Sequence, residues 1–305
     1  MREAEEAIKK ILKLKEEKNA AILAHNYQRP EIQDIADFVG DSFELARKAH
    51  GLSTDLIVMC GVDFMAEMVY ILNPEKRILI PDLGARCPLA AQLEVAEIAK
   101  AKENHPNAKV CLYVNTSAEA KAHADICCTS ANAVKVVNSL DSEEVIFGPD
   151  ENLAMYVQKR VKKRILPVPA HGYCIVHKRI LKDYVGKIKE AHPNALLLVH
   201  PECNPELQEM ADLVASTGGM VRFCAENNGK EFIIATEKGI IHRLKKVSPK
   251  SIFYSANENA VCSTMKRITL QKLARALEDE IFGVKVQEET AKKARRALER
   301  MCEIK

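Results

Sequence analysis

The 305-residue sequence contains no apolar run long enough to cross a membrane and no CxxC pair of cysteines. A membrane-spanning helix needs roughly 18 consecutive apolar residues, so we expect no membrane contact. The segment 1–18 alternates lysine and glutamate with apolar residues, unlike the apolar centre of a secretory signal peptide. Ten cysteines in a chain with no export signal favour reduced thiols, and we therefore expect a cytoplasmic protein.

The sequence also lacks a strong net charge and a flexible linker. Its formal net charge is +3, and lysine and glutamate alternate through the expected helices. Nucleic-acid-binding domains usually carry a basic patch, so we expect no nucleic-acid partner. The densest basic run, 159–164, is interpreted as a solvated helix face. A chain of this length suits two or three compact domains, and without stretches rich in Pro, Gly or Ser they should pack tightly.

One sequence unit occurs three times. The segment ENHPNAKVCLYVN at 103–115 returns as EAHPNALLLVHPE at 190–202, and a fainter copy, EKNAAILAHNY, lies at 17–27. Each copy is typical of a helix end, a short turn and a buried strand. Other positions keep the same spacing of 87 or 88 residues, among them Asp63, Asp150 and Glu237. Self-similarity at a fixed period indicates repeated structural units.

Within each copy, short apolar strands alternate with longer amphipathic helices. The strands are continuously apolar, which predicts that helices cover both faces of each sheet. We therefore predict an α/β protein of three homologous three-layer αβα domains with short parallel sheets, in a pseudo-threefold arrangement around a central active site. The predicted domains are residues 1–87, 88–174 and 175–262. Residues 263–305 are expected to form C-terminal helices that complete and cap the repeats.

The first strand of each copy ends in a triplet with reactive or polar side chains. The triplets are His25-Asn26-Tyr27, Tyr113-Val114-Asn115 and His200-Pro201-Glu202. Ligands of open parallel sheets bind beyond the carboxyl ends of the strands, where these triplets should lie. Histidines and tyrosines there could bind anions or carry protons, and Glu202 could act as a general base. A single histidine at a strand end is more often structural, but the repetition favours a function.

Hydroxyl side chains occur at the expected start of one helix in each copy. They are Ser42, Ser130 and the pair Ser216-Thr217. Backbone N–H groups and the helix dipole attract anions at such positions. For any single position an ordinary N-cap is the simpler interpretation. Three such positions around one cavity would predict a small substrate with several negative charges.

Three cysteines, Cys87, Cys174 and Cys262, occupy the same loop of the three copies. The other seven cysteines lie in apolar or helical contexts and are interpreted as small buried hydrophobes. Three convergent thiolates suit a soft metal centre, and zinc would normally have a fourth ligand. An iron–sulfur cube held by three cysteines leaves one iron open to bind substrate oxygen. The alternative is that the three cysteines are buried and equivalent by ancestry alone.

The sequence resembles quinolinate synthase, the iron–sulfur enzyme of NAD biosynthesis, along essentially the whole chain. The resemblance is carried by AHNYQRPEIQDIADFVGDS (24–42), YVNTSAEAKAHADICCTSAN (113–132), FGPDENLA (147–154), HPEC (200–203), STGGM (216–220) and Cys262. It implies three homologous α/β domains around a [4Fe-4S] cluster, with Cys87, Cys174 and Cys262 at the ligand positions. Some members have a closely spaced cysteine pair near the C-terminus. The segment AVCSTMK around Cys262 has none, so we expect no thiol switch of that kind.

The resemblance implies condensation of iminoaspartate with dihydroxyacetone phosphate to give quinolinate, phosphate and water. An aspartate oxidase or dehydrogenase, in transient contact, could supply the unstable iminoaspartate. The positions implied as catalytic are Tyr27, Tyr113, His200 and Glu202. Those implied to bind substrate are His25, Ser42, Asn115, Ser130, His177, Ser216 and Thr217.

Two other functions stay open at this point. An iron–sulfur hydro-lyase acting on a small hydroxy acid would share the cluster and differ in its substrate. A non-enzymatic protein that binds anions or metal would need only the helix N-termini. Glu202 argues against such a binder, because a carboxylate facing an anionic ligand weakens binding.

Overall fold

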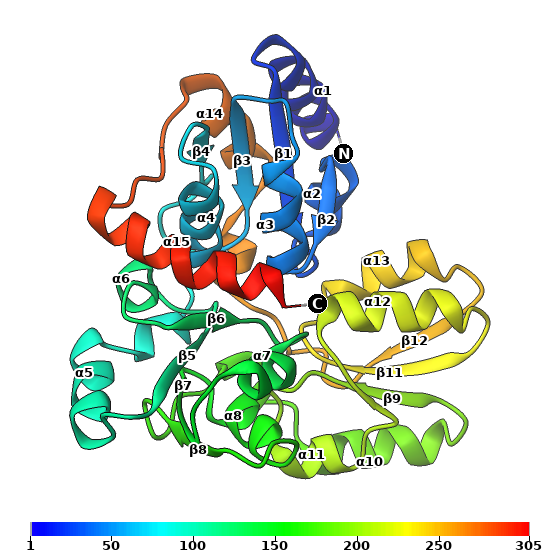
Figure 1. Cartoon of the computed structure of the whole chain (residues 1–305). Coiled ribbons are helices and arrows are strands. Elements are labelled where there is room, and N and C mark those ends of the chain that lie inside the picture. Colours follow the sequence, from blue (N-terminus) through cyan, green and yellow to red (C-terminus); the bar gives the residue numbers. More distant parts are fainter. Residues whose placement is uncertain (1, 305) are drawn as a thin grey trace.

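The computed structural model describes residues 2–304 and contains three parallel sheets of four strands, each enclosed by helices (Figure 1). The strands form where the sequence is continuously apolar, and nearly all of their side chains in the sheet centres are buried. Within residues 2–304, no helix is long and apolar enough to cross a membrane.

The first domain contains the sheet nearest the N-terminus. Its strands are β1 (Ala20–His25), β2 (Phe38–Gly40), β3 (Leu56–Cys60) and β4 (Arg77–Leu79). Its helices are α1 (Arg2–Glu17), α2 (Pro30–Ile35), α3 (Ser42–His50) and α4 (Asp63–Leu72). The spatial order of the strands is β2-β1-β3-β4.

The second domain follows a short 3-10 helix, η1 (Ala90–Gln92). Its strands are β5 (Lys109–Tyr113), β6 (Ile126–Cys128), β7 (Glu144–Gly148) and β8 (Arg164–Pro167). Its helices are α5 (Val95–Asn104), α6 (Ala118–Lys121), α7 (Ala133–Ser139) and α8 (Glu151–Gln158). The spatial order is β6-β5-β7-β8.

The third domain has the strands β9 (Leu196–Val199), β10 (Leu213–Val214), β11 (Glu231–Ala235) and β12 (Ile252–Ser255). Its helices are α9 (Ile175–Lys178), α10 (Lys182–Ala191), α11 (Pro205–Glu209), α12 (Thr217–Glu226) and α13 (Ile240–Val247). The spatial order is β10-β9-β11-β12, the same pattern as in the other two sheets. The predicted α/β class with three similar αβα domains is confirmed. The predicted residue boundaries between the domains stay a prediction.

One aspartate joins the first two strands in every domain. It stands directly before the second strand, and its carboxylate accepts the backbone N–H of a residue in the first strand. The N–O distances are 2.8 Å for Ile22–Asp37, 2.8 Å for Val110–Asp125 and 2.7 Å for Leu197–Asp212. These aspartates recur every 87 or 88 residues because each connects the edge strand of its sheet to the neighbouring strand.

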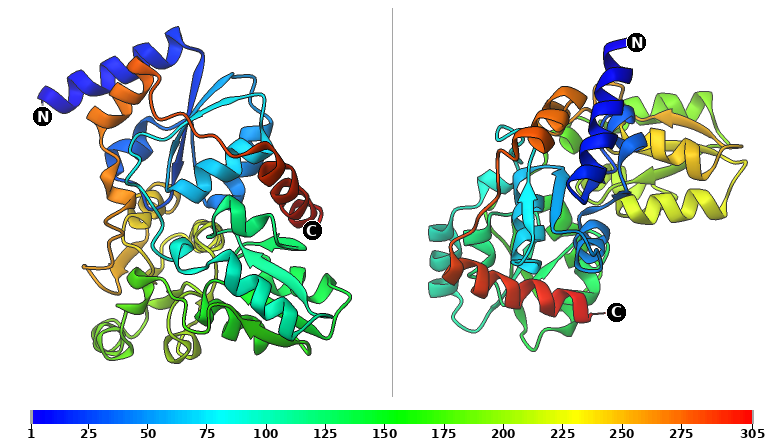
Figure 2. Two further views of the ribbon diagram at one scale, coloured as in Figure 1. Left: turned by 90° about the vertical axis from the view of Figure 1, so that its left-hand side faces the viewer. Right: turned by 90° about the horizontal axis from the view of Figure 1, so that it is seen from above.

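The C-terminal helices return to the beginning of the chain. After a short 3-10 helix, η2 (Met265–Arg267), helix α14 (Leu270–Asp279) packs along α1 on the first domain (Figure 2). Helix α15 (Glu288–Glu303) then crosses to the second domain, where it covers the edge strand β6 and also contacts α4 and α6 (Figure 1). Its buried face contains Ala291, Ala294, Ala297, Leu298 and Met301. The first two domains and these helices share one continuous hydrophobic core.

The packing of α14 on α1 predicts a stability effect. Leu277 on α14 is fully buried, and its replacement by alanine should leave a cavity that costs about 2–5 kcal/mol of unfolding free energy. Thermal or urea unfolding of Leu277→Ala measures this loss. Gln271→Ala, at an exposed position of the same helix, is the control and should unfold like the parent protein. Equal stability of Leu277→Ala and the parent would contradict this packing.

Candidate active site

A cavity lies where the carboxyl ends of the strands of the three domains meet. All but one of the site residues expected from the sequence line it: His25, Tyr27, Ser42, Cys87, Tyr113, Asn115, Ser130, Cys174, His177, His200, Glu202, Thr217 and Cys262. The exception is Ser216, whose hydroxyl accepts the Gly219 N–H at 3.2 Å and so caps α12. One cavity therefore collects the strand-end triplets, the cysteine loops and the hydroxyl side chains.

His25 and His200 occupy equivalent strand ends and make the same local hydrogen bond. Nδ1 of His25 accepts the Tyr27 N–H at 3.2 Å, and Nδ1 of His200 accepts the Glu202 N–H at 3.3 Å. With Nδ1 in use as an acceptor, the neutral ring carries its proton on Nε2. Burial lowers the pKa of each ring from 6.5 to about 3. Both histidines are thus neutral hydrogen-bond donors at physiological pH.

The Glu202 carboxylate is buried at the centre of the site. Its Oε1 accepts the Tyr113 hydroxyl at 2.7 Å, and its Oε2 lies 2.7 Å from Nδ1 of His177. At the second contact the ring is not aligned for a regular hydrogen bond. Burial by itself raises the pKa of Glu202, but His177 and His200 outweigh this effect and lower that pKa below its ordinary value. Glu202 is therefore ionised at neutral pH.

A chain of polar contacts connects Tyr27 to this carboxylate. The Tyr27 hydroxyl lies 2.5 Å from Oγ1 of Thr236, and the same oxygen lies 2.8 Å from Nε2 of His177. Burial, followed by the charge of Glu202, raises the pKa of Tyr27 well above 10, so its hydroxyl stays protonated. The contacts run from Tyr27 through Thr236 and His177 to Glu202 and end at Tyr113. Side chains of all three domains take part in this chain.

Sequence reasoning missed Thr236. It follows the last residue of β11 directly, and its positions in the other two copies are Val62 and Pro149. Because neither of these is polar, the repeat carries no signal for a functional residue at this position. Only the hydroxyl's place between Tyr27 and His177 reveals it.

Two of the three predicted hydroxyl positions lie at helix starts. Ser42 is the first residue of α3, whose N-cap is the adjacent Asp41, and Thr217 is the first residue of α12. The prediction was wrong for Ser130, because α7 begins only at Ala133. A turn closed by the Thr129 N–H and the Asn132 side chain, 2.7 Å apart, comes before it. Ser130 nevertheless lines the cavity.

The cysteine loops have equal lengths in the three domains. Cys87, Cys174 and Cys262 each lie ten residues after the first residue of their strand, which is Arg77, Arg164 or Ile252. The extra residue that places Cys262 one position late therefore precedes β12, at the opposite end of the sheet. All three thiols are free and half-buried, and all line the cavity. Burial raises the pKa of the Cys87 and Cys174 thiols.

The donor atoms fit a soft metal centre in two ways. Within residues 2–304, the cysteines that line the cavity are one from each domain, and no fourth one reaches it. Three such thiols match a cluster that keeps one metal without a protein ligand. In addition, single donor atoms of Cys174, His177 and Glu202 lie within 4.8 Å of one another, close enough to share one metal ion. Metal binding would deprotonate the thiols despite their raised pKa.

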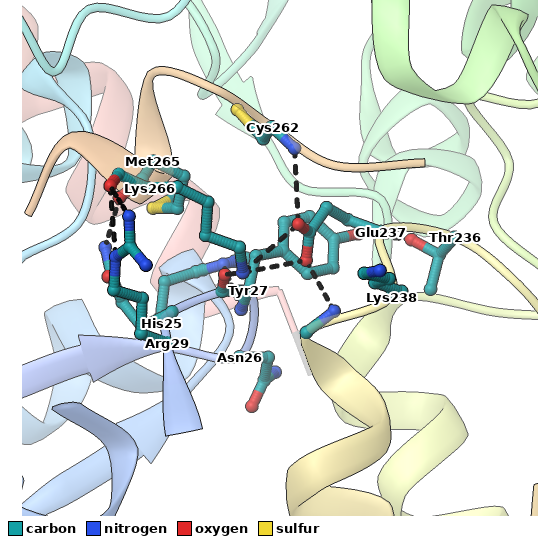
Figure 3. Close-up of polar contacts among 12 residues, drawn as sticks. His25, Asn26, Tyr27, Arg29, Thr236, Glu237, Lys238, Cys262, Met265 and Lys266 are labelled. Atoms are coloured by element: carbon teal, nitrogen blue, oxygen red, sulfur yellow. Dashed lines mark hydrogen bonds and ion pairs between the residues drawn. The ribbon is translucent and has the colours of Figure 1, made fainter. Parts of the chain in front are cut away.

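Further residues that the sequence did not single out as site residues also reach the cavity. Glu237 follows β11 and is fully buried, and Figure 3 shows it between Tyr27 and the Cys262 loop. Asp41 lines the cavity at the start of α3, and burial, with the neighbouring Glu44, raises the pKa of Asp41. The repeat spacing had indicated that Glu237 is equivalent to Asp63 and Asp150, but it had indicated no function for it.

The chain is similar to known proteins along nearly its whole length. The family model for "Quinolinate synthetase A protein" matches residues 9–303. Quinolinate synthase of Pyrococcus furiosus is 54% identical over 304 residues, which cover 100% of both chains. The quinolinate synthase of Pyrococcus horikoshii is 54% identical over 297 residues, covering 97% of this chain and 98% of the relative. That of Methanothermobacter thermautotrophicus is 54% identical over 295 residues, covering 96% of this chain and 97% of the relative.

The two buried histidines predict how stability depends on pH. The folded protein keeps His25 and His200 neutral down to about pH 3, whereas the unfolded chain binds protons below about pH 6.5. The unfolding free energy should therefore fall as the pH falls from 6.5 towards 3, by about 1.4 kcal/mol per pH unit for each ring. His200→Asn should lower the slope of unfolding free energy against pH by about 1.4 kcal/mol per pH unit, the share of one ring. Urea unfolding between pH 7 and 4 measures it.

His50→Asn is the control, because His50 is exposed at the end of α3. Its slope should equal that of the parent protein. An unchanged slope in His200→Asn would mean that this ring is protonated in the folded state.

Proposed function

Because the chain belongs to the quinolinate synthetase A family, we propose that it is an enzyme that condenses iminoaspartate with dihydroxyacetone phosphate to quinolinate, phosphate and water. One observation carries the proposal: three cysteines, one from each domain, line the same cavity as a buried carboxylate and its proton-carrying neighbours. A simple binding protein would not need an ionised carboxylate in a cavity for anions.

Cys87, Cys174 and Cys262 are the residues that we assign to a [4Fe-4S] cluster. From their three loops they would supply one thiolate from each domain, and one iron of the cluster would then have no protein ligand. An iron of that kind supplies Lewis acidity towards a substrate oxygen. Thiolates are the ligands that such clusters use.

The substrates carry a phosphate and two carboxylates, and the cavity offers uncharged donors for them. The Nε2–H groups of His25 and His200 can donate hydrogen bonds to these anions without adding charge. Thr217 stands at the N-terminus of the ten-residue helix α12, where the dipole favours negative charge. The other residues assigned to substrate binding are Ser42, Asn115, Ser130 and, through its place at the α12 N-cap, Ser216.

Glu202 is assigned as the general base. Its ionised carboxylate can accept a substrate proton, and Nδ1 of His177 lies 2.7 Å away. The proton can continue through the Thr236 hydroxyl to Tyr27, because these contacts are 2.8 and 2.5 Å long. On the other side, Tyr113 donates to the same carboxylate and fixes its orientation. These residues can thus remove and return protons during bond formation, ring closure and the loss of water.

The source of iminoaspartate is part of the proposal. Iminoaspartate is unstable, so an aspartate oxidase or dehydrogenase would have to supply it, through transient contact, in the same compartment, which we expect to be the cytoplasm.

Replacing Cys174 tests whether the cavity cysteines hold a cluster. Cys174→Ser should lose the visible absorbance of the cluster, most of the iron and sulfide, and the formation of quinolinate, because serine is a much poorer ligand for iron–sulfur clusters. Cys302→Ser is the matched control, because Cys302 is exposed on α15. This variant should keep the absorbance, the iron and sulfide content and the formation of quinolinate. Both variants are purified and assayed without oxygen.

The same measurements separate the alternatives. Iron without inorganic sulfide would favour a single ion at Cys174, His177 and Glu202 over a cluster. A cluster without quinolinate formation, but with dehydration of a hydroxy acid, would favour the hydro-lyase. Full quinolinate synthesis by Cys174→Ser would contradict the cluster's assignment.

Removing the Thr236 hydroxyl tests the chain of polar contacts. Thr236→Val keeps the shape of the side chain but cannot bridge Tyr27 and His177, so kcat should fall about 100-fold or more while KM changes little. Thr236→Ser retains the hydroxyl and should keep most of the activity. Steady-state assays with both substrates measure the effect. Equal kcat values for the valine and serine variants would remove Thr236 from the proton path.

A further inference from the structure

Each domain holds the backbone of its cavity cysteine with a carboxylate. The carboxylate follows the third strand of the domain in chain order, and one of its oxygens accepts the backbone N–H of the cysteine. The N–O distances are 2.9 Å for Cys87–Asp63, 3.2 Å for Cys174–Asp150 and 3.2 Å for Cys262–Glu237. The contact thus recurs at the same place in three domains whose cysteine loops otherwise differ in sequence.

The same carboxylates are fixed at the start of a helix. Each also accepts a backbone N–H close to its own position, where a helix begins. These N–O distances are 2.9 Å for Phe64–Asp63, 2.7 Å for Leu153–Asp150 and 2.7 Å for Gly239–Glu237. A carboxylate bound to a helix start has little freedom to move, so each cysteine loop is attached to a rigid element. The helices are α4, α8 and α13.

Burial shows that these are not surface contacts. Asp150 and Glu237 are almost completely buried, and Asp63 is half-buried. A buried carboxylate destabilises a fold unless donors satisfy its oxygens. At Asp150 and Glu237 the cysteine N–H is one of those donors, so the loop and the carboxylate depend on each other.

We propose that Asp63, Asp150 and Glu237 are positioning residues that fix the cysteine loops so that the three Sγ atoms face the common cavity before a metal cluster binds. That the bound group is an iron–sulfur cluster rests on the function proposed above. Ordering a loop costs conformational entropy, and a loop that is already ordered binds its metal with less of that cost. Outer contacts of this kind orient ligands in metal sites generally.

In the third domain, the carboxylate that holds the cysteine loop is also connected to Tyr27. Lys266 lies 3.1 Å from the Glu237 carboxylate and also donates to the backbone oxygen of Tyr27 (Figure 3). Gly239 makes room for this junction, because a Cβ there would lie 2.5 Å from Nζ of Lys266 and 2.8 Å from the Tyr27 oxygen. The Cys262 loop and the Tyr27 strand end are therefore held by the same ion pair, across two domains.

Asp63 and Glu67 provide a matched pair of variants on one helix. Glu67 lies one turn after Asp63 on α4, and its carboxylate also accepts a backbone N–H, that of Ala118 at 2.9 Å. Asp63→Ala and Glu67→Ala each remove one carboxylate from the same helix, but only the first releases a cysteine loop. Asp63→Asn keeps an acceptor oxygen and serves as the rescue variant.

The first measurement uses the apoprotein and does not depend on a cluster. Alkylation of each cysteine by iodoacetamide is followed by mass spectrometry at fixed pH. In Asp63→Ala, Cys87 should react about 10-fold faster than in the parent protein, since a hydrogen bond to a charged group no longer closes the loop. The rates for Cys174 and Cys262 should not change. Asp63→Asn and Glu67→Ala should both react like the parent.

The second measurement uses anaerobically reconstituted protein. Asp63→Ala should release iron to a chelator about 10-fold faster and show an altered electron paramagnetic resonance spectrum after reduction, whereas Asp63→Asn and Glu67→Ala should match the parent. The proposal is overturned if Cys87 reactivity in Asp63→Ala equals that of the parent, or if Glu67→Ala exposes Cys87 as much. A parent protein that takes up no cluster contradicts the proposed function, while the alkylation result still decides the positioning role.

Discussion

The candidate active site depends on one buried carboxylate. Glu202 lies in the third domain, accepts a hydrogen bond from Tyr113 of the second, and pairs with His177. Through Thr236 the same contacts reach Tyr27 of the first domain. A carboxylate at this depth needs several partners, and the contacts that lead to it, directly or through Thr236 and His177, come from all three domains. The electrostatic needs of a single group thus constrain how the three domains are placed around it.

Much of the fold could be predicted because its signals are local. Continuous apolar runs located the strands, and the 87- or 88-residue period showed that one unit is used three times. The strand-end rule then brought His25, Tyr113 and Glu202 to one cavity. Ser130 shows the limit of local signals: the turn formed by Thr129 and Asn132 delays the start of α7, and nothing in the hydroxyl spacing reveals this.

The residues that reasoning missed act through contacts between distant segments. The period marked Asp63, Asp150 and Glu237 as equivalent, but their cysteine partners lie 24 or 25 positions further along the chain. Thr236 joins a residue 209 positions away to one 59 positions away. Such contacts depend on the packing of whole domains, and a single sequence contains no direct record of it.

Helices α14 and α15 return to the first two domains, and α14 packs on the N-terminal helix α1, so N-terminal and C-terminal segments of the chain lie together. In an open row of repeats, the terminal unit has one unsupported side and can melt first. Here α14 and α15 pack on the first domain, and their buried residues belong to the same hydrophobic core as those of that domain. Unfolding of either terminal helix would therefore expose buried apolar surface of the first domain. Fraying from the ends thus costs free energy.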